Sequence, residues 1–67
     1  MPATRLGMRL KRLRIANGLT QVDLAKRAKI TQGYIAQLES GHQKDPSLSA
    51  LRRLAKALKV GVTELLG

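Results

Sequence analysis

The sequence predicts one all-α domain over residues 1–67, a compact arrangement of five short helices. Apolar residues recur at helical spacing, and the breaks between these segments fall at glycines and at Pro46. Tyr34 is the only aromatic residue, so the core must be built from aliphatic side chains, which suits closely packed helices. A chain of 67 residues has room for one domain, and the absence of cysteine excludes a disulfide.

The first helix is predicted from about Thr4 to Asn17. Thr4 is a suitable N-cap, and Asn17-Gly18 has the composition of a helix C-terminus. The inner face carries leucines at i, i+4 and i+7, which are Leu6, Leu10 and Leu13. The other faces carry the basic residues Arg5, Arg9, Lys11, Arg12 and Arg14.

The second helix is predicted from Gln21 to about Ala28. Thr20 precedes it and Asp23 follows three residues after Thr20, which is an acidic variant of the capping box. The carboxylate also lies where the helix dipole favours negative charge. The inner stripe of this helix is Leu24, Ala25 and Ala28.

Only two residues, Lys29 and Ile30, separate the second helix from Thr31, which is the N-cap of the third. The third helix runs over residues 32–39 and stops at Ser40-Gly41. A connection this short cannot join antiparallel helices, so the two must meet at a steep angle with Ile30 filling the corner. This is the geometry of a helix-turn-helix.

The fourth helix follows a stretch of turn composition over residues 41–46 and is capped by Ser47. Its inward residues are predicted to be Leu48, Leu51, Leu54, Ala55 and Leu58. Its outward residues are Arg52, Arg53, Lys56 and Lys59. Gly61 ends this segment, and residues 62–66 form a last short helix.

The chain carries 13 Lys and Arg against four Asp and Glu, a formal charge of +9. Such an excess attracts polyanions, which are nucleic acids or anionic membrane surfaces. No apolar run approaches the roughly 20 residues that a membrane span requires. The basic N-terminus lacks the continuous apolar segment of a signal peptide, so a cytoplasmic location is expected.

The segment LTQVDLAKRAKITQGYIAQLESG, residues 19–41, resembles the helix-turn-helix of the phage repressor and Cro family, also called the xenobiotic-response-element type. The resemblance extends from about Leu6 to Leu66 and includes Leu13-Arg14, the S-G-x-x-x-x-P loop and the motif LAKALKV before the last helix. It implies a lambda-repressor-like fold in which helices 2 and 3 form the helix-turn-helix. It also implies that the third helix enters the major groove of DNA.

The expected base-contacting residues are on the outward side of the third helix: Gln32, Gly33, Ala36 and Gln37. They face away from the body because Ile35 and Leu38 point toward it. A glutamine can form two hydrogen bonds with adenine N6 and N7, and an alanine can contact the methyl group of thymine. Gly33 replaces the larger polar residue usual in the family, so close backbone approach is expected there. The alternative interpretation is a plain solvated face.

Gln21 is the first candidate for a phosphate contact, because a helix N-terminus favours an anion and the family uses a glutamine here for this purpose. The alternative is a residue that merely begins the helix. The other candidates surround the third helix and its following loop: Thr31, Tyr34, Ser40, His42, Gln43 and Lys44. Tyr34 can equally be a half-buried core aromatic.

Glu39 would repel phosphates unless a cation neutralised it. In the family an arginine of the first helix pairs with this residue, and the matching position here is Arg14. The resemblance therefore implies a partly buried Arg14–Glu39 ion pair that ties the third helix to the first. A loose surface carboxylate is the alternative.

No catalytic or metal-binding pattern is found in the sequence. His42 is the only histidine and has no cysteine or acidic neighbour suited to a triad or a metal site, and the four carboxylates are scattered. Neither GxGxxG nor a P-loop occurs. No enzyme activity, metal or cofactor is therefore expected.

Sequence-specific binding of double-stranded DNA by a transcriptional regulator, in particular a repressor, is the leading interpretation. One domain offers few base contacts, so a homodimer that reads two half-sites is expected at least on DNA. The candidates for its interface are Val60, Val62, Leu65 and Leu66, although the last helix can also simply close the core. The chain has no room for a small-molecule sensor, so no small-molecule ligand is expected.

Two other interpretations remain. An antitoxin or a restriction–modification controller protein would also bind DNA, together with a partner protein. The other interpretation is a basic module that coats an anionic membrane. The ordered helix caps and the aliphatic core argue against it, because a membrane-surface peptide needs neither, so no membrane partner is expected. Under the leading interpretation this is a prokaryotic or phage protein associated with the nucleoid.

Overall fold

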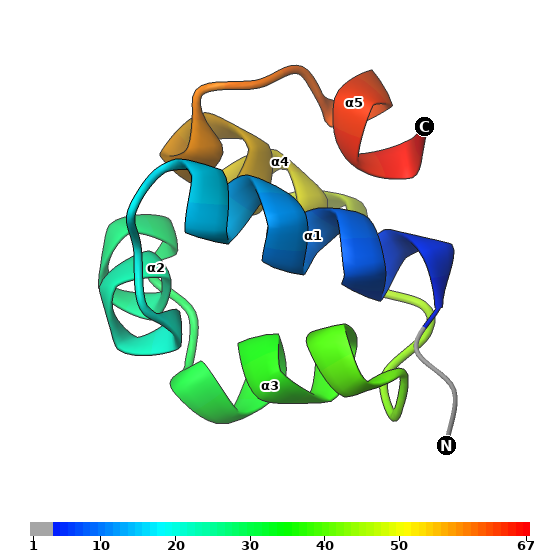
Figure 1. Ribbon diagram of the computed structural model, residues 1–67. Helices are drawn as coiled ribbons and strands as arrows, with labels where there is room; N and C mark the ends of the chain where they lie inside the picture. Colours follow the sequence, from blue (N-terminus) through cyan, green and yellow to red (C-terminus); the bar gives the residue numbers. More distant parts are fainter. Residues whose placement is uncertain (1–3) are drawn as a thin grey trace.

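The computed structural model describes residues 4–67, and the helices α1 to α5 account for all of the regular secondary structure in this range. Their bounds are α1 (Arg5–Ala16), α2 (Gln21–Ala28), α3 (Gln32–Ser40), α4 (Leu48–Leu58) and α5 (Val62–Leu66). The predicted all-α, five-helix architecture is confirmed, with α3 one residue longer than expected. Residues 1–3 of the predicted domain lie outside the described residues. Figure 1 shows α1 between α3 on one side and α4 with α5 on the other.

Hydroxyl side chains fix the beginnings of the first four helices. The hydroxyls of Thr4, Thr20, Thr31 and Ser47 each accept a hydrogen bond from the backbone amide three residues later, at 2.9–3.1 Å. At α2 the capping box is complete, because the Asp23 carboxylate accepts from the Thr20 amide at 3.0 Å. This hydrogen bond from the Thr20 backbone lowers the pKa of the Asp23 carboxyl below its ordinary value.

Two lysines take a left-handed backbone conformation where glycine would be the usual residue. Lys29 ends α2 with φ 58°, and Lys59 ends α4 with φ 60°. The amide of Ile30 donates back to the carbonyl of Ala25 at 3.0 Å, which closes the turn between α2 and α3. This conformation costs a lysine about 1–2 kcal/mol, so tertiary packing holds the turn in place.

All five helices contribute to one aliphatic core. The largest fully buried side chains are those of Leu10, Leu24, Ile35, Leu38, Leu54, Leu58 and Leu65. Leu6, Leu13, Ile30 and Tyr34 pack against this core while remaining partly exposed. The short α2 and α3 are thus held by buried leucine and isoleucine rather than by their own length, since isolated helices of eight or nine residues are not stable in water.

Two apolar residues lie elsewhere than the sequence indicates. Leu48, predicted to face inward, is 55% exposed, whereas Ala50 is buried. Leu48 is the first residue of α4, and helical side chains tilt toward the N-terminus, so its side chain projects past the start of the helix. Leu65, expected at a dimer interface, is completely buried inside the domain. It packs against the core because α5 closes the bundle, so its side chain is not available to a second copy.

The backbones of α1 and α3 approach each other closely at Gly7. A Cβ atom at this position would collide with the backbone carbonyl oxygen of Leu38 and lie 3.1 Å from that of Glu39. Both atoms belong to the backbone of α3, which cannot move aside as a flexible side chain can. The absence of a side chain at Gly7 therefore sets the distance between the two helices.

Replacing Gly7 with alanine is expected to lower the free energy of unfolding by about 1–3 kcal/mol, because α1 must shift away from α3. Urea unfolding followed by circular dichroism measures this change. Gly33→Ala is the matched control, since a Cβ there meets no atom within 4 Å. That control is expected to raise the free energy of unfolding by about 0.5–1 kcal/mol through helix propensity. Equal effects of the two substitutions would contradict the steric explanation.

Candidate nucleic-acid interface

The outward side of α3 carries the four residues expected to contact bases. Gln32, Gly33 and Gln37 are exposed and Ala36 is half-buried. Ile35 and Leu38, on the opposite side, are completely buried. Two amide side chains are thus presented around small residues, on a helix that cannot rotate without exposing its core leucine and isoleucine.

The Arg14–Glu39 ion pair expected from the resemblance is present and is bidentate. Arg14 Nε donates to Glu39 Oε2 at 2.7 Å, and Nη2 donates to Oε1 at 3.1 Å. The two side chains are 12% and 5% exposed, so water screens the pair little. The hydrogen bond to Glu39 raises the pKa of the Arg14 guanidinium above its ordinary value. Arg14 Nη1 also donates to the carbonyl of Leu19 at 2.8 Å, which fixes the chain just before α2.

Gln21 makes a contact that sequence reasoning missed. Its Nε2 donates to Glu39 Oε1 at 3.1 Å, so that one carboxylate joins α1, α2 and α3. The amide nitrogen carries two protons, and this bond uses one of them. The other remains available to an acceptor such as a phosphate oxygen. No local pattern reveals a contact between residues 18 positions apart on different helices, so only a known family pairing could have indicated it.

The remaining phosphate candidates divide between the two ends of α3. Thr31 is exposed at the start of α3, and Tyr34 is half-buried against the core, which is consistent with the second of its two interpretations. At the other end, the Ser40 hydroxyl donates to the carbonyl of Gln37 at 3.2 Å and lies 2.8 Å from His42 Nδ1.

The loop after α3 is ordered by its own polar side chains. Gln43 accepts a hydrogen bond from the Asp45 amide at 3.1 Å, and the backbone amide of Gln43 donates to the carbonyl of Gln37 at 3.0 Å. Lys44 is exposed. The structure therefore places Ser40, the last residue of α3, beside the loop that carries His42, Gln43 and Lys44.

Other kinds of site find no support in residues 4–67. Within that range no group of three or more His, Cys, Asp or Glu side chains is placed to hold a metal ion. Likewise, none of the helices over these residues is both long and apolar enough to cross a membrane.

A family model described as helix-turn-helix matches residues 10–65 of the chain. The immunity repressor protein of Bacillus phage phi105 is 39% identical over 62 residues, which are 92% of this chain and 42% of the repressor. The chain therefore spans less than half the length of that relative.

Solved structures give the same result. The restriction–modification controller protein C.AhdI from Aeromonas hydrophila is 36% identical, with a TM-score of 0.87 over 91% of both chains. SinR, a master regulator for biofilm formation solved in complex with DNA, is 31% identical, with a TM-score of 0.90 over 92% of this chain and 98% of that one.

Substituting either partner of the Arg14–Glu39 pair is expected to lower the free energy of unfolding by about 3–5 kcal/mol, because the other charge stays buried without a partner. Arg14→Met and Glu39→Met test the two sides by urea unfolding. The double variant Arg14→Met/Glu39→Met is expected to lose less than the sum of the two single losses. Additivity within about 0.5 kcal/mol would show that the two side chains do not interact.

Proposed function

The chain belongs to the helix-turn-helix family, and from this membership we propose that it binds double-stranded DNA sequence-specifically and regulates transcription, as a repressor. The observation that carries the proposal is the outward side of α3, where Gln32 and Gln37 are exposed around the small residues Gly33 and Ala36. This side is rigid, since the other side of α3 lies in the core. We propose that the protein binds DNA without catalysing a reaction, and that it does so in the cytoplasm.

In the proposed complex α3 lies in the major groove, with its glutamine amides on adenine edges and Ala36 near a thymine methyl. Gln21 binds a phosphate through its second amide proton, while Glu39 holds the first. Thr31 at one end of α3 and the loop residues His42 and Lys44 at the other position the domain on the two flanking strands. The ion pair keeps the Glu39 carboxylate from repelling those phosphates.

A homodimer completes the proposed function, because four residues on one helix read few base pairs. Leu66 is 54% exposed, and Val60 and Val62 are partly buried against the core. These three residues leave an apolar edge beside α5 that a second copy can cover. Leu65 holds α5 in place from the inside.

A second candidate function is favoured by one observation. The restriction–modification controller protein C.AhdI is 36% identical to the chain, with a TM-score of 0.87. A controller of a restriction–modification system is therefore the alternative kind of regulator. Binding of a partner protein, as in an antitoxin, belongs to the same alternative.

Selection of bound duplexes from a random pool tests the proposed function. A chain that reads bases is expected to enrich one sequence, and a dimer is expected to enrich it as two copies related by two-fold symmetry. A pool that stays random after repeated rounds would overturn the proposal. The position of the selected sites in a genome, beside a restriction–modification operon or elsewhere, separates the two candidates.

Gln32→Ala and Gln37→Ala are each expected to reduce the preference for the selected sequence over shuffled DNA. Each glutamine that makes a bidentate pair contributes about 1–3 kcal/mol of discrimination. Gel-shift titration with both duplexes measures this preference, and affinity for shuffled DNA at low salt is expected to stay unchanged. An equal loss on all sequences would remove the two residues from the base-reading set.

Gln21→Ala and Lys44→Ala are expected to weaken binding to every sequence, with different salt dependence. Loss of a lysine contact makes the slope of log K against log salt shallower by about 0.9, whereas loss of a neutral amide leaves the slope unchanged. Titrations over a range of salt concentrations distinguish the two effects. A Gln21→Ala loss confined to particular base pairs would contradict its phosphate role.

A further inference from the structure

The positive charge of the chain does not lie on the helix proposed to read DNA. α3 contains no lysine or arginine in any of its nine residues. All 13 basic residues belong to the part of the chain that the structure describes, and one of them, Arg14, is paired with Glu39. Binding by α3 therefore leaves most of the charge of +9 without a role.

Five of the basic residues surround one concavity, which we call the α2–α4 groove. They are Arg27, Lys29, Arg53, Lys56 and Lys59, and all five are exposed. The groove has a volume of about 510 Å³, and Ala28 and Ala57 complete its lining. Arg53 spans the gap between the two helices, because its Nη1 donates to the carbonyl of Lys29 at 3.3 Å. No carboxylate lines the groove.

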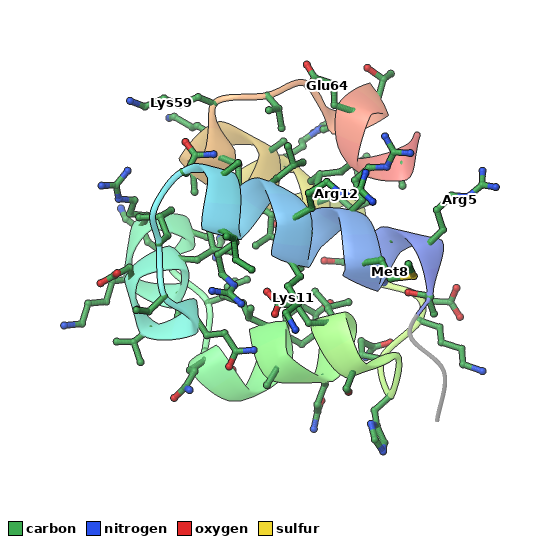
Figure 2. The ribbon with its side chains drawn as sticks, in the orientation of Figure 1. Arg5, Met8, Lys11, Arg12, Lys59 and Glu64 are labelled. Atoms are coloured by element: carbon green, nitrogen blue, oxygen red, sulfur yellow. The ribbon has the colours of Figure 1, made fainter. Side chains whose placement is uncertain are left out.

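The α2–α4 groove extends away from α3. Figure 2 shows Lys59 at the opposite side of the molecule from α3. The domain measures 22–26 Å along its principal axes, while the major groove that would receive α3 is about 12 Å wide. A duplex seated on α3 therefore lies on the other side of the domain from Lys59. Lys29 and Arg53 lie nearer to Thr31 at the start of α3, so the argument applies to the end of the groove formed by Arg27, Lys56 and Lys59. An anion bound at that end is separate from the duplex on α3.

The lining of the groove favours a phosphate backbone over an acidic protein segment. Protein–protein interfaces draw most of their binding energy from a few large side chains buried in pockets, and the apolar lining here consists of two alanines. Phosphates need no such anchors, since their binding rests on cations and the release of counterions. We propose that the α2–α4 groove binds the phosphate backbone of a second DNA duplex, so that one domain bridges two duplexes. The first of these contacts rests on the proposed function.

A purely structural role accounts for only part of this cluster. Cations in the last turn of a helix stabilise its dipole, which explains Arg27 in α2 and Lys56 in α4. Arg53, in the middle of α4, also has a structural contact, because it donates to the Lys29 carbonyl at the end of α2. These local roles do not explain why cations of α2, of α4 and of the residues that end them line the same concavity. A structural role predicts a change in stability without a change in the capture of DNA.

The test uses the whole chain and two duplexes. The first, fixed to beads, carries the selected sequence, and the second, fluorescent and of shuffled sequence, is free in solution. The groove variant is R27Q/K56Q/K59Q. The matched control R5Q/R12Q/R52Q removes three exposed cations that lie outside the groove. Urea unfolding of both variants confirms that each is folded.

Both variants are expected to bind the bead duplex equally well, and only the groove variant is expected to lose the fluorescent duplex. Loss of three phosphate contacts reduces its capture by about ten-fold at moderate salt and makes the salt slope shallower by about 2 to 3. Equal losses in both variants would assign capture to net charge and overturn the proposal. Undiminished capture by the groove variant would place the second duplex elsewhere, such as on α3 of a second copy.

Two further arms address the identity of the anion. In the first arm, the selected sequence of the bead duplex is given longer flanking DNA on both sides. If the groove variant then binds this duplex more weakly than the control does, and the difference grows with flank length, the groove contacts the same duplex as α3. That result would overturn the bridging proposal. If poly-glutamate binds the groove more tightly than shuffled DNA does, the ligand is an acidic protein segment. If the chain binds DNA without sequence preference, the proposed function is refuted but the bridging proposal is not. Capture of a second duplex can still be measured, because the beads can then carry any sequence.

Discussion

The carboxylate of Glu39 is the group on which the arrangement of the first three helices depends. It accepts two hydrogen bonds from Arg14 of α1 and one from Gln21 of α2, and it belongs to α3. Removing a carboxylate from water is unfavourable, and the three donors offset this cost only when all of them are in place. A small rotation of α3 would break this geometry. The pair therefore acts on orientation more than on net stability.

The same interaction leaves the exposed side of α3 without a charged group. Because Glu39 is neutralised inside the domain, the exposed side of α3 presents amides, a methyl group and backbone, all of them uncharged. Hydrogen bonds to base edges depend on direction, whereas attraction by lysine and arginine does not distinguish sequences. The basic residues lie on α1, α2, α4 and the connecting segments instead, where they leave the direction of the glutamine amides unaffected.

Close packing in a domain of this size depends on small residues at particular places. Gly7 allows the backbone of α1 to approach that of α3, which brings Arg14 within reach of Glu39. Lys29 takes an unfavourable backbone conformation so that only three residues connect α2 and α3. The fully buried leucines and Ile35 supply the apolar contacts that hold these features together, since no disulfide is possible.

The sequence by itself determined the helices, because the signals that specify them are local. Four hydroxyl caps and the spacing of the leucines placed all five helices within about one residue. The Arg14–Glu39 pair was foreseen through the family resemblance, not through spacing. Tertiary structure alone decided that Leu48 is exposed and Leu65 buried, and that Gln21 binds Glu39. It also decided that five cations of α2, α4 and the residues that end them line one groove. Helical periodicity gives the direction of a side chain along its own helix, but where the neighbouring helices end, and which of them meet, depends on contacts between residues distant in the chain.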